Sequence, residues 1–127
     1  MSYDAYDSQD TEQDVRHHLV RMVGGAAAVT KVIGKGIAVA RTAAGRYTLT
    51  WTDNPGTLLG YSFGLQSTTI NALRGCSVTV GVFNTTAFTL EVDVWDFLAQ
   101  AAGVTVARDL AALEWLSLDL VFKLTGP

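Results

Sequence analysis

The segment AFTLEVDVW, residues 87–95, alternates apolar and polar side chains with a period of two. Its apolar positions are Phe88, Leu90, Val92 and Val94. Successive side chains of a β-strand point to opposite faces, so this pattern is typical of a strand with one buried face. Residues 76–83 carry a second run of the same kind. Asn-Thr-Thr at 84–86 joins the two runs, which together predict a β-hairpin.

A second hairpin is predicted further toward the N-terminus. Residues 37–41 and 47–51 both have strand character, and the link between them at 42–45 is short and ends in glycine. The Asp-Asn-Pro-Gly sequence at 53–56 then predicts a turn.

Two more segments show strand periodicity. In the first, Leu59, Tyr61, Phe63 and Leu65 share one face, while glycine and serine leave the opposite face nearly bare. Glycines inside a strand indicate a bulge or the close approach of another backbone. In the second, residues 116–124 place five apolar side chains on one face and mainly polar ones on the other. Both patterns predict half-buried strands.

Together the segments predict about seven or eight short strands separated by turns. This number favours an all-β fold, an antiparallel β-sandwich or jelly-roll-like arrangement. Residues 15–23 fit either a short helix or a strand, and a Gly-Gly pair is expected to break the chain after them. Ala107, Leu110 and Leu113 are spaced like one side of a helix, but β-branched residues precede them. We therefore expect at most one short helix, and the sequence leaves the conformation of residues 15–33 and 96–113 open.

The chain length of 127 residues fits one domain. Residues 1–14 contain five acidic residues and almost no aliphatic one, which predicts a flexible, acidic N-terminal arm. Residues 15–127 then form a single β-sandwich domain. The hydrophobic fraction of 49% and the mean hydropathy of +0.25 are high for a soluble monomer. They indicate that some apolar surface faces other subunits.

Several function classes are disfavoured. The nine basic residues are scattered and the net charge is −3, which argues against nucleic-acid binding. The N-terminus lacks the pattern of a signal peptide, and no apolar run reaches the ~18 residues of a membrane span. We therefore expect synthesis in the cytoplasm and no membrane partner. The single cysteine, Cys76, is interpreted as a small buried hydrophobe.

Cofactor and metal sites are not expected either. The Gly-Lys-Gly sequence at 34–36 lacks the spacing of a phosphate-binding loop, so it predicts a turn. His17 and His18 are adjacent, and adjacent side chains of a strand point to opposite faces. They cannot readily bind one metal ion.

The acidic and aromatic residues leave alternatives open. Glu91, Asp93 and Asp119 could meet on one sheet face, and paired carboxylates can catalyse acid–base chemistry. A solvated strand face is the simpler interpretation, so we expect no enzyme unless these three groups line a pocket. The three tryptophans, at positions 51, 95 and 115, are interpreted as core or subunit contacts, with carbohydrate stacking as the alternative.

The order of these motifs resembles that of small structural proteins of tailed-bacteriophage virions, the decoration or cement and fibre-like class. The segments that carry the resemblance are KGIAVART (35–42), GRYTLTW (45–51), LLG (58–60), DLAA (109–112) and the strand at 118–124. The match extends from about residue 29 to the end of the chain. It does not include the acidic arm.

The resemblance implies a non-enzymatic virion protein without cofactors, which assembles as a homo-oligomer, a trimer, on the capsid exterior. Its partner there is the major capsid protein, whose neighbouring subunits it ties together. The aromatic and acidic side chains of the arm are the candidate partner contacts: Tyr3, Asp4, Tyr6, Asp7 and Asp10. The alternative is a fibre, neck or tail component that binds a host glycan or receptor through exposed Trp or Tyr.

Overall fold

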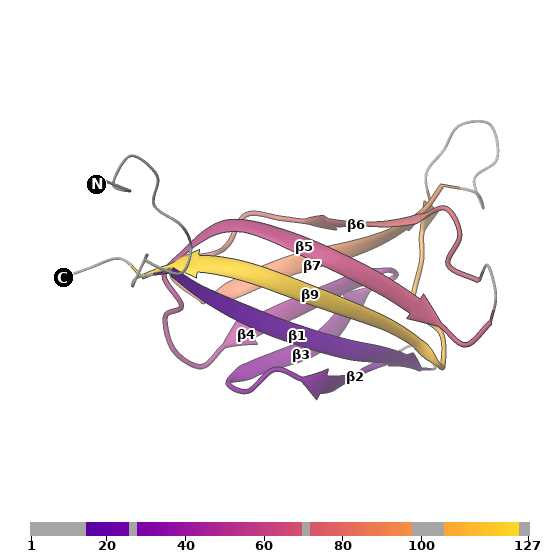
Figure 1. The fold of residues 1–127 in the computed structure, drawn as a ribbon, viewed down its shortest axis with the longest axis horizontal. Coiled ribbons are helices and arrows are strands. Elements are labelled where there is room, and N and C mark those ends of the chain that lie inside the picture. Colours follow the sequence, from indigo (N-terminus) through magenta and orange to yellow (C-terminus); the bar gives the residue numbers. More distant parts are fainter. Residues whose placement is uncertain (1–14, 26–27, 70–71, 98–105, 125–127) are drawn as a thin grey trace, which may run out of the picture.

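The computed structural model describes residues 15–25, 28–69, 72–97 and 106–124, and these residues form strands, turns and loops without a helix. Two antiparallel sheets pack face to face, which confirms the predicted β-sandwich (Figure 1). The strands are β1 (Val15–Gly25), β2 (Ala28–Ile33), β3 (Ile37–Ala43), β4 (Arg46–Trp51), β5 (Thr57–Ser67), β6 (Cys76–Val80), β7 (Thr89–Asp96), β8 (Val106–Ala107) and β9 (Glu114–Lys123).

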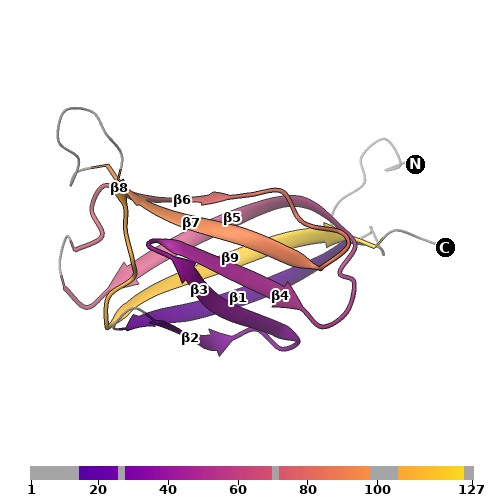
Figure 2. The same ribbon diagram turned by 180° about the vertical axis from the view of Figure 1, so that it is seen from behind.

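The chain crosses repeatedly between the two sheets. Sheet A has the strand order β2-β1-β9-β5, and sheet B has the order β3-β4-β7-β6, with the short β8 also paired to β7. Figure 2 views the molecule from the side of sheet B. The last long strand, β9, lies between β1 and β5 and is antiparallel to both. The centre of sheet A is therefore completed only when the C-terminal part of the chain is in place.

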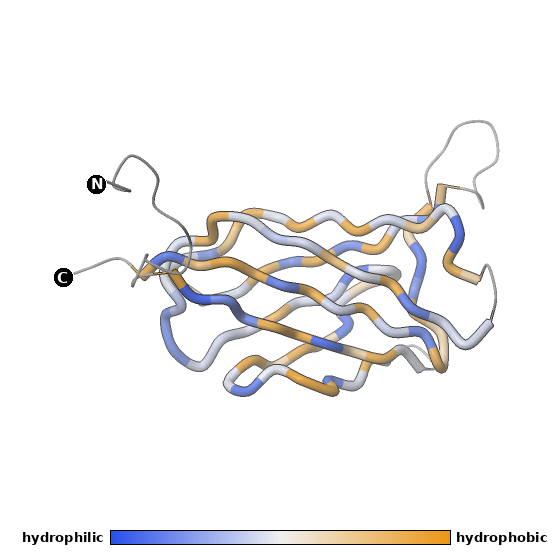
Figure 3. Tube along the Cα trace, in the orientation of Figure 1, coloured by the Kyte–Doolittle hydropathy of each residue, from blue (hydrophilic) through white to orange (hydrophobic). Residues whose placement is uncertain are grey.

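Alternating burial along the strands builds the core. In β9, Leu116, Leu118, Leu120 and Phe122 are fully buried, as the period-two pattern predicts. Strands β1, β4 and β7 contribute the facing side chains, and this alternation is visible along the tube in Figure 3. Each large aliphatic side chain removed from water in this way contributes about 1.5–3 kcal/mol.

The two predicted hairpins have different outcomes. Strands β3 and β4 pair as the predicted hairpin, with Ile37 opposite Trp51 and Arg41 opposite Tyr47. Strands β6 and β7 also pair, but β6 ends at Val80 and β7 begins at Thr89, so the connection is longer than predicted. The Asn84 side chain organises this loop by accepting hydrogen bonds from the backbone N–H groups of residues 86 and 87.

Glycine positions correct two predictions. Residues 15–23 are a strand, and β1 continues through the Gly-Gly pair to Gly25 rather than breaking before it. A Cβ atom at Gly24 would lie 2.1 Å from the carbonyl oxygen of Leu110, so this glycine permits a close backbone approach. In β5 the predicted bulge lies between Leu58 and Gly60, and it takes Leu59 off the face where we expected it.

The predicted helical face of Ala107, Leu110 and Leu113 is wrong for the described residues 106–113. These residues form β8, an extended stretch and a turn in which Leu113 has a positive φ of 60°. The three residues do not share one buried face, because Leu110 is buried, Ala107 pairs with Trp95 of β7, and Leu113 is 55% exposed. Residues 98–105 lie outside the described part of the chain.

Hydrogen bonds fix this crossing segment, residues 106–113, to sheet B. The guanidinium of Arg41 donates twice to the Asp109 carboxylate, over 2.9 and 3.0 Å. Asp109 Oδ1 also accepts from the backbone N–H of Gly45 at 2.7 Å. The buried hydroxyl of Tyr47 accepts from the backbone N–H of Leu110 at 2.8 Å. The hairpin turn between β3 and β4 and the crossing segment therefore hold each other in place.

A second set of contacts fixes the segment to the start of β9. Arg108 donates to both carboxylate oxygens of Glu114, each over 2.8 Å, and Ala111 N–H donates to Glu114 Oε1 at 2.7 Å. Glu114 is only 4% exposed. Burial alone would raise the pKa of this carboxyl, but the hydrogen bonds from Arg108 and Ala111 outweigh it and lower the pKa.

We predict that Tyr47→Phe lowers the free energy of unfolding by about 1–3 kcal/mol, because the buried N–H of Leu110 loses its acceptor. Urea denaturation followed by fluorescence measures the change. The matched control is Tyr61→Phe, since Tyr61 is 42% exposed and its loss of a hydroxyl should change stability by less than about 0.5 kcal/mol. Equal effects of the two substitutions would contradict this assignment.

A second prediction concerns acid stability. The hydrogen bond from Arg41 lowers the pKa of Asp109 below its ordinary value of 3.8. A carboxyl with a lowered folded-state pKa stabilises the fold above its unfolded pKa, and this contribution is lost as the pH falls through the folded value. Asp109→Asn should therefore be less stable than the wild type at pH 7, and the difference should shrink below pH 3.8. A difference that stays constant from pH 7 to pH 2 would contradict this.

Candidate functional site

The two long sides of the sandwich differ in how their edge strands are protected from pairing with another chain. On one side, Lys31 of β2 donates its ammonium group to the carbonyl oxygens of Gly34 and Ile37, over 2.9 and 2.8 Å. This lysine ties the edge of sheet A to the start of β3, the edge strand of sheet B. A lysine on an edge strand also discourages pairing with another chain. The β2–β3 side is therefore protected.

The opposite side, formed by β5 and β6, has no such protection among the described residues. There β5 pairs with β9 alone, and β6 pairs with β7 alone. Both strands run along the same long side of the molecule (Figures 1 and 2). Neither β5 nor β6 contains a charged residue or a proline. We call the strip between them the seam; its apolar side chains are those of Leu58, Tyr61, Phe63, Leu65, Leu73, Cys76, Val80 and Val82.

The register of β5 determines where its side chains point. Tyr61 and Phe63 lie opposite Leu120 and Leu118 of β9, which face the core. Tyr61 and Phe63 are therefore on the inner face of sheet A, yet each remains 42% exposed. Sheet B does not extend far enough to cover them. The seam thus exposes aromatic side chains at positions that a closed sandwich would bury.

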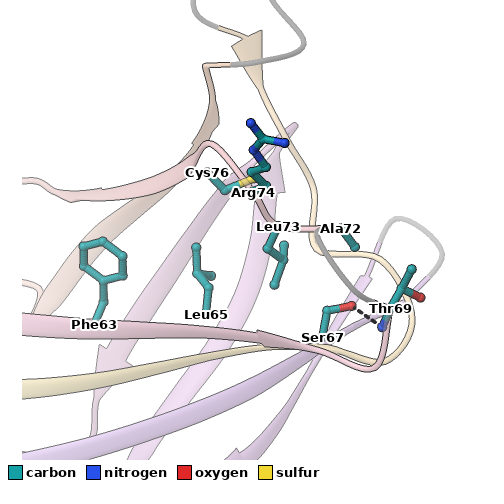
Figure 4. Close-up of a pocket in the computed structure, with 8 residues that line it drawn as sticks. All are labelled: Phe63, Leu65, Ser67, Thr69, Ala72, Leu73, Arg74 and Cys76. Carbon is teal, nitrogen blue, oxygen red and sulfur yellow. Dashed lines mark hydrogen bonds between the residues drawn. The ribbon is translucent and has the colours of Figure 1, made fainter.

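Two open hollows lie along the seam. The first has a volume of about 420 Å³, and in Figure 4 the side chains of Phe63, Leu65 and Leu73 lie in a row between β5 and β6. The second, of about 410 Å³, lies between Leu58 and the loop that carries Val82. Val82 is 95% exposed. Apolar side chains therefore occur along much of this side of the sandwich, and Arg74 and Thr69 also line the first hollow.

The chemistry of the seam favours contact rather than catalysis. Cys76 is half-buried at the first hollow, and burial raises the pKa of its thiol above the ordinary value of 9.0. The thiol is the unreactive form of cysteine, because the thiolate is the nucleophile. The sequence predicts a buried hydrophobe at Cys76, whereas the residue is only partly buried.

The two histidines point to opposite faces of β1, as predicted. His17 lies on the outer face of sheet A, with Nδ1 3.1 Å from the Asp119 carboxylate. His18 accepts a hydrogen bond from the Trp51 indole N–H at 3.0 Å, and burial lowers its pKa. Within the described ranges, no group of three His, Cys, Asp or Glu side chains is arranged to hold a metal ion.

The three carboxylates considered as acid–base candidates do not meet. Glu91 and Asp93 lie on the outer face of sheet B, where Arg46 contacts them at 3.1 and 3.0 Å. Asp119 belongs to sheet A and pairs with His17. The expectation that the three could share one sheet face is therefore wrong, because they belong to different sheets.

The tryptophans also separate. Trp51 is in the core, 5% exposed, with its ring edge-on to Phe83 and Phe122. Trp95 lies on sheet B and donates its indole N–H to the Thr79 hydroxyl. Trp115 has the Arg21 guanidinium 5.6 Å from its ring centre. One tryptophan is thus a core residue, and the other two already have polar partners.

The candidate contacts Tyr3, Asp4, Tyr6, Asp7 and Asp10 lie outside the described residues. Reasoning from the sequence did not identify the seam. The available signal was the charge pattern, because residues 57–67 and 76–80 are free of charged side chains. Comparison with protein-family models, curated proteins and solved structures finds no match to this chain. No helix in the described part of the chain is long and apolar enough to cross a membrane.

The seam yields a prediction about Cys76. Its alkylation by iodoacetamide should follow a pH profile with a midpoint above 9.0, because burial disfavours the thiolate. A Thr30→Cys variant in a Cys76→Ser background is the control, since position 30 is exposed on β2, away from the seam. The control thiol should react several-fold faster at pH 8. A midpoint near pH 7 for Cys76 would contradict the assignment.

Proposed function

We propose that the chain is a non-enzymatic structural subunit of a tailed-phage virion, a decoration protein that binds the outer capsid surface as a homo-oligomer. The observation that carries the proposal is the seam. An exposed sheet edge whose strands carry no charged side chain is prone to pair with another chain, and proteins that work as monomers normally protect such edges. The β5–β6 side is unprotected while the opposite β2–β3 side is protected, and this difference supports a role in assembly.

The sequence resemblance suggests that this assembly takes place on a phage virion. The hairpin motifs at 35–42 and 45–51 form β3 and β4, and DLAA (109–112) belongs to the crossing segment that they hold. The resembling segments are thus parts of one packed unit. Many copies of a small, rigid unit, each making modest contacts, can reinforce a shell because their contacts act together. This supports a cementing role over a catalytic one.

A fibre or tail module that binds a host glycan is the second candidate. It would use an exposed aromatic side chain, and Tyr61 is 42% exposed on the seam. Trp115 is less suited to sugar stacking, because Arg21 already lies over its ring. The same seam therefore distinguishes the candidates by what it contacts, a protein edge or a sugar.

The proposal is tested on virus particles. Purified chain, added to particles of the virus that encodes it after their own copies have been stripped, should sediment with them and raise the temperature at which they release DNA. Bovine serum albumin at the same concentration is the control for nonspecific protection. A chain that stays in the supernatant and binds a glycan array would contradict the proposal and favour the second candidate.

A further inference from the structure

We propose that the free edge of β5 pairs with β5 of a second copy of this chain, antiparallel and about a two-fold axis. The two copies of sheet A then form one continuous eight-stranded sheet. This inference rests on the proposed function in that it names the partner of the seam. It differs from the trimer that the sequence resemblance implies.

The length and regularity of β5 make it the pairing strand. It spans 11 residues, whereas the neighbouring edge strand β6 spans five. Among the described strands β5 is hydrogen-bonded to β9 alone, so its outward N–H and C=O groups are available for another strand. The bulge between Leu58 and Gly60 limits the regular part to residues 60–67. An antiparallel pair of identical strands is isologous and forms a closed dimer about a two-fold axis, whereas parallel pairing leaves a free edge for further copies.

The charge pattern makes β5 the favourable contact between two copies of the chain. The chain carries a net charge of −3, so the overall electrostatic interaction between two copies is repulsive. Strands β5 and β6 are the strands without a charged side chain, apart from the two-residue β8, and together they form one side of the sandwich. On the opposite side, the edge strand β2 carries the charged side chain of Lys31. Two like-charged copies can therefore approach most closely through β5.

The register follows from the regular part of β5. A two-fold axis at Phe63 places Phe63 opposite its own symmetry mate and Tyr61 opposite Leu65 of the second copy. These side chains share the inner face, so pairing brings the exposed aromatic side chains of both copies into contact and removes them from solvent. On the outer face, a Cβ atom at Gly60 or Gly64 would meet nothing within 4 Å. The same axis places Ser62 opposite Gly64 and Gln66 opposite Gly60 of the second copy, and Arg21 holds the Gln66 side chain through a hydrogen bond of 2.8 Å. Each larger outer-face side chain therefore meets a glycine.

The first test is the mass of the full chain in solution by light scattering. The wild type should have twice the monomer mass of 13.6 kDa. Phe63→Lys should weaken the dimer at least tenfold, because it buries a charge against its own symmetry mate. Leu19→Lys is the matched control, since Leu19 is 52% exposed on the outer face of sheet A, and it should remain dimeric. Tyr61→Lys serves as a second edge variant, and thermal melting confirms that each variant is folded.

The second test fixes the register. In a Cys76→Ser background, Phe63→Cys should form a disulfide-linked dimer under mild oxidation. Leu59→Cys should not, although Leu59 is 55% exposed on the same strand, because it lies in the bulge. A dimer that cross-links at position 63 supports the inference.

The contrary outcomes separate this inference from the proposed function. A trimer, or an oligomer that survives Phe63→Lys without cross-linking at position 63, overturns the β5 pairing and leaves the virion role standing. A monomeric wild type that still binds particles also overturns the pairing, and then residues 1–14 or a capsid subunit covers the edge. Failure to bind particles by a chain that dimerises through β5 overturns the proposed function alone.

Discussion

The central position of β9 in sheet A is the constraint on which the rest of the structure depends. Its four inward side chains fill the middle of the core, and it joins β1 to β5, two strands that make no ladder with each other. Without β9, β5 would have no partner among the described strands. Sheet A is thus assembled from the two ends of the described chain, and its stability depends on contacts between residues about a hundred positions apart.

The crossing segment, residues 106–113, fixes the path by which the chain reaches β9. It passes from sheet B to β9 with its charged groups paired to Arg41 on one side and Glu114 on the other. A buried charge is costly when unpaired, so these contacts specify one path for the chain more than they add net stability. The close approach of Gly24 to Leu110 then fits β1 against the same segment. One end of the sandwich is therefore closed and specified, while the β5–β6 side is open.

Local periodicity predicted the parts of this fold that depend on local sequence. The strands at 37–51 and 116–124 alternate cleanly, so their faces and the first hairpin followed from period two alone. The extent of β1 did not, because Gly24 has a packing partner that lies 86 residues away. The spacing of apolar side chains at 107–113 resembles that of a helix face. The segment instead packs against both sheets and does not present one face to the core.

The candidate site was harder to predict for a related reason. The shared face of Tyr61, Phe63 and Leu65 could be derived from the sequence, but its exposure depends on how far sheet B extends over sheet A. Likewise, Glu91, Asp93 and Asp119 are all outward-facing, and only the topology assigns them to different sheets. Outward direction is a local property, whereas the sheet to which a strand belongs is a property of the whole chain.

The central claim is that the edge of β5 is an association surface, and hydrogen–deuterium exchange at two protein concentrations tests it most directly. The outward N–H groups of residues 60–67 should exchange more slowly at high concentration, because a second strand accepts their hydrogen bonds. Exchange in β2, the protected edge of the same sheet, should not depend on concentration. Exchange in β5 that is equally fast at both concentrations, or new protection in β2 instead, would contradict the account.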